Sequence, residues 1–528
     1  MNKITSIPFL EIESIPQLIK DFLTQKIPGF EEKIFDLKNI KEQFEEKAQS
    51  FSSESRKTLV EVIAAQYHDF QLTSEQRENL QDLNLKSTFT VTTGHQLNLF
   101  TGPVFFIYKI LQTIKLAKFL QEHFPENHFV PIFWLASEDH DFEEINHFKT
   151  EDNFYEIKAK SGGAVGKILV EDDFFISQFE EEFEDAVFGT ELILILKRAY
   201  KKGNSLAEAT RTIVQELFAE FGLLVIDGDN RHLKEQMTEI FKDELLHQAL
   251  VSSTAEKVAF LSEKYGKVQV NPREINLFYL SETRDRIAFE DHKYIIVDRN
   301  QSFTESELIT ELHDFPERFS PNALLRPVYQ EMVLPNIAYI GGNAEIMYWL
   351  ELKDYYEKIN LPFPILIPRR SMLMVREKTL NKAEKLGLTL PDFFKNFAEI
   401  TKDIILDNHE ILKLLEDQRV LLDRHFELLK SKAALTDPTF ENLVDAEKTR
   451  QLKSFDRMEK RLLRAEKIKQ NEKITRLQDL FLRVHPGNAW QERSYNFSVF
   501  YAQYGKEWLY NCYEGIQVKE SELIIYSV

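Results

Sequence analysis

The most constraining feature of this sequence is an alternation of strand-like and helix-like segments after a helical start. Residues 87–93 (STFTVTT) are rich in β-branched side chains and end at Gly94, which predicts a strand followed by a turn. Residues 101–120 carry apolar side chains at helical spacing. Residues 129–136 (FVPIFWLA) are apolar without alternation, as in a strand buried on both faces, and 137–147 predict another helix. This order predicts a parallel α/β sheet.

Later segments extend the predicted sheet. Residues 222–227, 337–340 and 364–368 are short apolar runs next to glycine or proline, which predicts three further strands. The intervening residues 150–221 and 231–320 are too long for simple crossover connections. We therefore expect them to be insertions into a core that spans residues 1–375, of which the first 86 are predicted to be helical.

The chain loses strand character in residues 376–482, which are rich in Glu, Lys, Arg and Leu. Apolar residues there follow heptad spacing, at Ile404, Ile411, Leu415, Leu422, Phe426 and Leu429. Asp437-Pro438 interrupts the pattern before a second charged helical segment. This pattern predicts a long antiparallel α-helical coiled coil. Residues 483–528 recover aromatic residues and alternation, and we expect this tail to return to the core.

Composition excludes several classes of protein. Subtracting 86 acidic from 66 basic side chains leaves a net charge of −20, which argues against broad nucleic-acid binding. Residues 448–476 form a basic run. This run could bind RNA, or it could be the solvated face of a coiled coil. No apolar run reaches the roughly 18–20 residues of a membrane span. Glu11 and Glu13 interrupt the start where a signal peptide is apolar, so the sequence predicts a cytoplasmic protein.

Cys512 is the one cysteine of the chain, which excludes an intramolecular disulfide and a cysteine-based zinc site. We expect it to be a buried apolar residue and expect no zinc.

The segment 93–103 (TGHQLNLFTGP) is the first candidate ligand site. A glycine turn after a buried strand, followed by a helix with Thr101 as its predicted N-cap and Pro103 in its first turn, suits a phosphate or a carboxylate. The alternative is a simple strand–helix turn with polar caps. The candidate binding residues here are Gly94, His95, Gln96, Thr101 and Gly102.

The acidic segment 137–147 (SEDHDFEEINH) is the second candidate, since ligands of open α/β sheets bind at the carboxyl ends of strands. Its carboxylates suit an amine or Mg²⁺. His140 and His147 would share one face of the predicted helix. The alternative is a first helical turn whose acids complement the helix dipole. The functional interpretation favours Asp139, His140 and Asp141.

Residues 161–167 (SGGAVGK) do not meet the spacing of a phosphate-binding loop, because Ser161 replaces the first glycine and Ile168 follows the lysine. A hairpin turn is expected there instead.

Residues 322–342 predict a second strand–glycine–helix corner that suits a phosphate or a ribose. Arg326 and Gln330 lie one helical turn apart before the strand, and a helix follows the glycine pair. The candidate residues of this corner are Gly341, Gly342 and Glu345, with Tyr348 nearby. Arg369 and Arg370 follow the last predicted strand and could pair with an anionic substrate or begin a solvated helix.

Three motifs carry a resemblance to a known family. They are TGHQLNLFTGPVFFIYK, PIFWLASEDHDFEEINH and LRPVYQEMVLPNIAYIGGNAEIMYWLEL, in that order. Together they resemble the cysteine ligase family of bacillithiol biosynthesis, the cysteine-adding BshC-like enzymes. The resemblance covers the whole chain. The family usually has TGQQ where this chain has His95 at the third position.

The resemblance implies a Rossmann-type core akin to class I aminoacyl-tRNA synthetases, with connecting-peptide insertions and a coiled coil that forms a homodimer. It implies that cysteine is joined to the glucosamine amine of glucosaminyl malate, with ATP, alone or with Mg²⁺, activating the cysteine carboxylate as an adenylate. Gly94, His95 and Gln96 would face the nucleotide phosphates. Asp139, His140 and Asp141 would hold an amine or act as base. The malate carboxylates would be bound by Arg326, Arg369 or Arg370.

Two other functions remain open from the sequence. A non-catalytic partner in the same pathway would bind ATP and substrate without turnover. A synthetase-like RNA-binding protein would use the basic run along the second coiled-coil helix.

Overall fold

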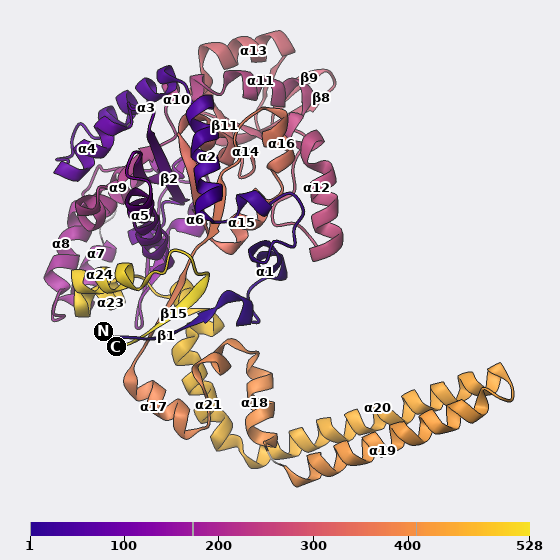
Figure 1. Ribbon diagram of the computed structural model, residues 1–528. Helices are drawn as coiled ribbons and strands as arrows, with labels where there is room; N and C mark the ends of the chain where they lie inside the picture. Colours follow the sequence, from indigo (N-terminus) through magenta and orange to yellow (C-terminus); the bar gives the residue numbers. More distant parts are fainter. Residues whose placement is uncertain (1, 172–173, 408) are drawn as a thin grey trace. The chain divides into compact units, whose positions relative to one another are not determined.

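The computed structural model (Figure 1) describes residues 2–171, 174–407 and 409–528. The chain divides into two compact units. The first comprises the N-terminal residues up to Glu11, Ile15–Met374 and Gln491–Ser527. The second comprises Ile12–Ser14, Val375–Trp490 and Val528.

A five-stranded parallel sheet forms the centre of the first unit. Its order is β13 (Ile365–Pro368), β12 (Asn336–Gly341), β2 (Thr88–His95), β3 (His128–Leu135) and β6 (Leu224–Asp227). The five predicted strands and their parallel arrangement are therefore confirmed. β2, the first strand of this sheet in sequence, lies in the middle. The later strands are added on both sides of it. The order reverses between β2 and β12, which is where open α/β sheets bind ligands.

The strands of this sheet are buried, and most of their side chains are apolar or, in β2, threonines that are also buried. Helices α2 (Leu37–Ser50) and α5 (Phe105–His123) share one hydrophobic cluster with β2 and β12, in which Phe44 stacks on Phe89. Helices α3 (Ser53–Gln66) and α4 (Ser74–Asp82) contact β6.

Helix α5 begins later than its sequence predicts. Thr101 is not its N-cap: it ends the short turn η3 (Leu99–Thr101), and Val104 precedes the helix. Phe100 and Thr101 have φ values of 45° and 69°, so the backbone leaves the helical region there. The turn is held by Asn496, whose side-chain amide donates to the carbonyls of Phe100 and Gly102 at 2.7 Å each.

The start of the chain also differs from the prediction. Residues Asn2–Pro8 form strand β1 and not a helix, because β1 pairs antiparallel with β15 (Glu522–Ser527) near the other end of the sequence. β14 (Ser371–Val375) is the third strand of that sheet. Helix α1 (Gln17–Leu23) follows, and α22 (Gln491–Ser494), α23 (Ser498–Tyr504) and α24 (Lys506–Gly515) precede β15.

The segment between β3 and β6 holds the first insertion. It contains α6 (Phe142–Ile145), β4 (His147–Lys149), β5 (Phe154–Glu156), α7 (Phe174–Phe183), α8 (Gly189–Ala199) and α9 (Leu206–Phe218). The helix predicted over 137–147 is thus reduced to α6, and His140 and His147 share no helix face. The hairpin predicted at 161–167 is also wrong. The end of segment 161–167 forms the 3₁₀ turn η4 (Val165–Lys167), in which the Gly166 N–H donates to the Ser137 carbonyl at 2.8 Å.

The second insertion contains a further sheet that the sequence did not predict. Its antiparallel strands are ordered β10 (Gln301–Phe303), β9 (Lys293–Ile296), β8 (Arg284–Glu290), β7 (Leu277–Leu280) and β11 (Phe319–Pro321). Helices α10 (Arg231–Glu235), α11 (Thr238–His247) and α12 (Ala249–Tyr265) precede it, and α13 (Glu305–Asp314) crosses between β10 and β11. The chain returns to the main sheet through α14 (Leu325–Val333), and α15 (Asn343–Trp349) and α16 (Lys353–Lys358) follow β12.

The second unit is helical and contains the predicted coiled coil. Helices α19 (Glu410–Ala433) and α20 (Pro438–Lys469) run side by side (Figure 1), and Asp437 caps α20 with Pro438 in its first turn. Arg419–Asp456 and Lys430–Asp445 pair across the two helices at 3.0 and 2.6 Å. Helices α17 (Glu377–Lys385), α18 (Phe397–Leu406) and α21 (Asn471–Val484) complete the unit. Of the helices described, none is both long enough and apolar enough to cross a membrane.

Candidate functional site

A cavity of about 760 Å³ lies at the carboxyl ends of the central strands of the first unit. Residues 94–96 reach it from the end of β2, residues 134–140 from the end of β3, and Tyr339 from β12. The second insertion supplies the facing wall with residues 269–273, Phe278 and Arg284. The volume of the cavity, and its position at the point where the strand order reverses, are those of a small-molecule site.

Asp139 is a carboxylate of the cavity lining that neighbouring groups hold in place. Gln96 Nε2 donates to Asp139 Oδ2 at 2.7 Å, and the His140 backbone N–H donates to Oδ1 at 2.7 Å. Arg284 lies 3.8 Å from the same carboxylate. Burial alone would raise the pKa of Asp139, but the hydrogen bonds from His140 and Gln96 and the charge of Arg284 hold it well below its usual range. Asp139 is therefore a fixed negative charge.

Arg284 connects the second insertion to this carboxylate. Its guanidinium lies over the Phe278 ring and donates to Ser320 Oγ at 3.0 Å and to the Pro321 carbonyl at 2.8 Å. A further nitrogen of Arg284 lies 3.1 Å from His140 Nδ1. Because arginine only donates, His140 Nδ1 accepts in this contact.

A buried ion pair lies at the reversal point between β2 and β12. Lys109 of α5 donates to both oxygens of Glu345, at 2.8 and 2.9 Å, and to the Gly94 carbonyl at 2.6 Å. Tyr339 donates to Glu345 Oε2 at 2.5 Å. Burial would raise the pKa of Glu345, but Lys109 and Tyr339 lower it to about 2. Glu345 is therefore a second fixed negative charge at the cavity wall.

His95 lies beside this ion pair and lines the cavity. Its ring packs edge-on against Phe105 and Phe106, and its buried Nε2 has no hydrogen-bond partner among the residues that the structure describes. Burial, together with the positive charge of Lys109, lowers the pKa of His95 to about 3, so its ring is neutral at pH 7. An unpaired buried polar atom at a cavity wall indicates a ligand contact.

Arg326 of α14 contributes a positive charge to the cavity lining. It donates to Gln330 Oε1 at 3.1 Å and lies 5.9 Å from the centre of the Tyr339 ring. Burial opposes the charged form, but Tyr339, Tyr348 and the Glu345 carboxylate raise the pKa of Arg326 above its usual value. Arg326 and Tyr348 thus present a permanent cation and a hydroxyl to the cavity.

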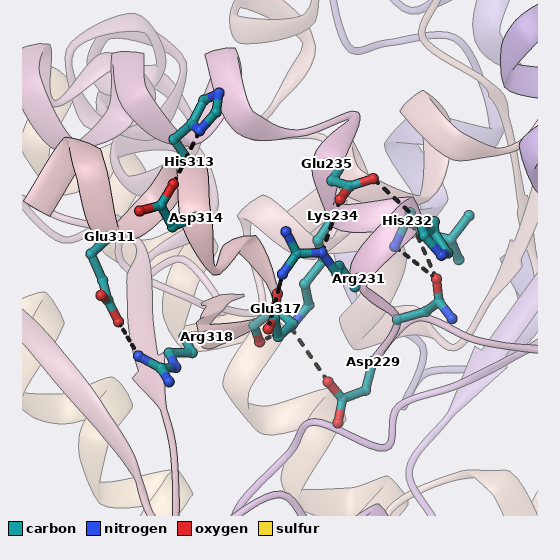
Figure 2. A network of polar contacts seen from close by, with 12 residues as sticks. Asp229, Arg231, His232, Lys234, Glu235, Glu311, His313, Asp314, Glu317 and Arg318 are labelled. Carbon is teal, nitrogen blue, oxygen red and sulfur yellow. Dashed lines mark hydrogen bonds and ion pairs between the residues drawn. The ribbon is translucent and has the colours of Figure 1, made fainter.

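Glu138 lines the cavity one residue before Asp139 and has a different environment. It pairs with Lys234 of α10, whose side chain is fully buried. Lys234 also donates to the Glu317 carbonyl at 2.9 Å and lies 3.6 Å from Asp229, and Figure 2 shows it between these two residues. Burial raises the pKa of Glu138 and outweighs the opposing effect of the Lys234 charge.

The cavity brings together many of the residues that the sequence singled out. Of the predicted cofactor-binding and catalytic residues, it is lined by Gly94, His95, Gln96, Asp139, His140 and Glu345. Of the predicted substrate-binding residues, it is lined by Arg326 and Tyr348. Asp141 is exposed outside this lining, where its carboxylate caps α6. Gly341 and Gly342 lie behind Glu345, and Gln330 is buried behind Arg326, where it also donates to Glu331 at 2.9 Å.

The other predicted residues lie in structural contacts outside the cavity lining. Thr101 and Gly102 belong to the turn held by Asn496. Arg369 forms a two-bond pair with Glu492, at 2.9 and 2.7 Å, and both side chains are buried. Arg370 donates to the backbone carbonyls of Pro368, Gln517 and Val518. These guanidinium groups already have protein acceptors.

Sequence reasoning did not single out several charged residues at or behind the cavity, and within the acidic segment it favoured Asp139, His140 and Asp141 over Glu138; the other residues are Lys109, Lys234, Arg273 and Arg284. Glu138 stands in the same acidic motif as Asp139, so its position after a buried strand was an available signal. Arg284 and Lys234 lie in the second insertion, far from any motif. Among the residues described, no group of three or more His, Cys, Asp or Glu side chains could hold a metal ion. The role of Mg²⁺ remains a prediction.

Comparisons with known proteins agree with this architecture. Residues 3–370 match the family described as "Bacillithiol biosynthesis BshC, N-terminal Rossmann-like domain", and residues 372–528 match its "C-terminal coiled-coil domain". A Flavobacterium johnsoniae protein is 39% identical over 93% of both chains, and one from Christiangramia forsetii is 37% identical over 98% of both. Each bears the name "Putative cysteine ligase BshC". The chain, with its Rossmann-like sheet and its coiled coil, belongs to the BshC family.

Proposed function

We propose that this protein is an ATP-dependent cysteine ligase of bacillithiol biosynthesis. It would form an amide between the carboxyl group of cysteine and the glucosamine amine of glucosaminyl malate. The observation that carries the proposal is the distribution of charge in the cavity, whose lining contains both the fixed carboxylate of Asp139 and the permanent cation of Arg326. The names of the relatives support the same reaction.

The Asp139 wall suits the amine. Its carboxylate is ionised at neutral pH and is oriented by Gln96 and Arg284, so an ammonium group gains a charge-assisted hydrogen bond there. His140, whose Nδ1 accepts from Arg284, presents the rest of its partly exposed ring beside it. In this proposal Asp139 holds the amine substrate and His140 helps to orient it.

The Arg326 wall suits a carboxylate, since a guanidinium binds carboxylates through paired hydrogen bonds. Tyr348 adds a hydroxyl beside it. In this proposal Arg326 binds a malate carboxylate. In this proposal Arg369 and Arg370, whose guanidinium groups already have protein acceptors, do not bind the substrate.

The end of β2 suits the nucleotide. His95 Nε2 is buried without a hydrogen-bond partner in the described part of the chain, and a neutral histidine can donate one hydrogen bond to a phosphate oxygen without a charge of its own. The Gly94 Cβ position lies 3.2 Å from Trp134, so a larger residue would crowd the strand end. ATP, when bound, would activate the cysteine carboxylate. The residues of this chain would bind and orient the reacting groups.

The test is a reaction of the purified protein with cysteine, glucosaminyl malate, ATP and Mg²⁺, followed by mass spectrometry of thiols labelled with bimane. The expected result is bacillithiol that appears only when all substrates are present, and a loss of at least tenfold in rate for Asp139→Asn. Binding of ATP and glucosaminyl malate without any product would favour the non-catalytic partner. Absence of both binding and product would refute the proposal.

A further inference from the structure

The cavity is lined by three carboxylates, Glu138, Asp139 and Glu345, and their hydrogen-bonding states differ. Asp139 accepts from Gln96 and from a backbone N–H, with Arg284 beside it. Glu345 accepts from Lys109 at both oxygens, from Tyr339 and from the Gly342 N–H. These contacts stabilise the ionised form and use much of the acceptor capacity of both groups.

Glu138 is the exception. Among the described residues, the polar contact of its side chain is with Lys234, through Oε1. Beyond this ion-pair contact, the buried Oε1 has no hydrogen-bond partner among the described residues, and the Glu138 side chain lines the cavity. Glu138 therefore offers an acceptor with unused capacity next to the Asp139 wall.

Lys234 fixes the position of this acceptor. Its side chain is fully buried, and its ammonium group is held by the Glu317 carbonyl at 2.9 Å and lies 3.6 Å from Asp229. Arg231, three residues earlier, pairs with the Glu317 side chain at 3.1 Å, which anchors the turn that supplies this carbonyl (Figure 2). The ion-pair contact with Lys234 holds the Glu138 carboxylate in place at the cavity wall.

We propose that Glu138 is the catalytic base that takes a proton from the ammonium group of the amine substrate, and that Lys234 is its positioning residue. This inference rests on the proposed ligase function and goes beyond it, because it assigns the proton transfer to a residue outside the Asp139, His140 and Asp141 set.

The substrate ammonium, held by Asp139, gives one proton to the Glu138 carboxylate and becomes a free amine. Its nitrogen forms a C–N bond to the carboxyl carbon of cysteine, which the nucleoside triphosphate has activated. The C–O bond to the nucleotide phosphate breaks, and its electron pair leaves with the nucleoside monophosphate. The second nitrogen proton passes to solvent water as the amide forms.

The directions of the pKa shifts of the three carboxylates support these different roles. A general base works best when its pKa is close to the working pH. Burial raises the pKa of Glu138, whereas the contacts of Asp139 and Glu345 lower theirs. Asp139 thus binds the ammonium without competing for its proton. The charged or titratable groups that act on Glu138 are Lys234, Asp229, Lys167, Arg284 and Tyr329.

The test separates the two halves of the reaction in Glu138→Gln. Exchange of labelled pyrophosphate into ATP, driven by cysteine, reports activation alone, and formation of bacillithiol reports both halves. The expected result is exchange within about threefold of the parent and amide formation reduced by about 10²- to 10⁴-fold, the usual contribution of a general base. Glu143→Gln, at an exposed position on α6, is the matched control and should leave both rates unchanged.

Two further measurements keep the inference testable if Glu138→Gln folds poorly. Glu138→Asp should retain a measurable part of the amide rate, and Lys234→Met should shift the acidic limb of the kcat profile against pH while exchange persists. Amide formation at the parent rate in Glu138→Gln, or an equal loss of exchange and amide formation in a folded variant, would overturn the assignment. A parent protein with no exchange and no product would instead refute the ligase function.

Discussion

Removal of Glu492 should destabilise the first unit strongly. This carboxylate is 2% exposed and accepts two hydrogen bonds from Arg369, which is 4% exposed, and one from Ser371 Oγ at 3.0 Å. In Glu492→Ala the guanidinium of Arg369 stays buried without its counter-charge. Breaking a buried pair by removing one partner costs about 3–5 kcal/mol. The neighbouring cation of Arg493, whose pKa is already lowered by burial and by Arg369, adds repulsion in the same direction.

The assay is urea unfolding followed by tryptophan fluorescence, since Trp134, Trp349 and Trp508 all lie in the first unit. With an m-value of about 3 kcal/mol/M, a loss of about 4 kcal/mol lowers the midpoint by about 1.3 M. The control is Glu514→Ala, which removes an exposed ion pair with Lys115 and should cost less than about 1 kcal/mol. Equal midpoints for the two variants would refute the reasoning and would return Arg369 to the set of substrate-binding candidates.

Three other predictions concern the cavity and the coiled coil. Arg326→Met should raise KM for glucosaminyl malate by about 10- to 100-fold in steady-state assays, because a hydrogen bond to a charged group contributes about 1.5–3 kcal/mol; an unchanged KM would refute this. The pKa of His95 is lowered from 6.5 to about 3 in the folded protein. Between these pH values the unfolded chain therefore binds more protons than the folded protein, and stability falls as pH falls from 6.5 towards 3. Unfolding midpoints of His95→Gln should depend less on pH in that window; an unchanged dependence would contradict the argument. Substitution by lysine at three exposed apolar positions of α19, Leu414, Leu421 and Leu428, should convert the expected homodimer to a monomer in size-exclusion chromatography with light scattering. A dimer that is unaltered in this variant would exclude this surface of α19 as the dimer interface.

The main sheet was predictable from the sequence because each of its strands is a local signal. Residues 129–136 are apolar on both faces, and the β-branched run before Gly94 cannot easily be anything but a strand. The coiled coil was predictable for the same reason, since heptad spacing and Asp437-Pro438 are local patterns. Elements whose pairing decides their structure were missed. Strand β1 depends on β15, which lies more than 500 residues away.

The helix predicted over 137–147 shows why the site was harder to predict than the sheet. Charged residues after a strand suit the first turn of a helix, and that local pattern favoured one. The structure instead uses these side chains for contacts with distant partners: Glu138 with Lys234, and Asp139 with Gln96 and Arg284. A loop satisfies these contacts, and only Phe142–Ile145 remain helical. The residue types were therefore readable, but their roles depended on partners that one sequence does not reveal.

Arg284 makes the second insertion an integral part of the site. Its Nε and one Nη are fixed by Ser320 and the Pro321 carbonyl on β11, so the register of the antiparallel sheet sets the position of the remaining nitrogen. That nitrogen lies near both Asp139 and His140. Arg284→Lys keeps the charge but cannot make these bonds together, because an ammonium lacks the planar fork. The Asp139 carboxylate would then lose its orientation while remaining ionised. We therefore expect KM for the amine substrate to rise while pyrophosphate exchange persists, and loss of exchange in this variant would place Arg284 in the activation step instead.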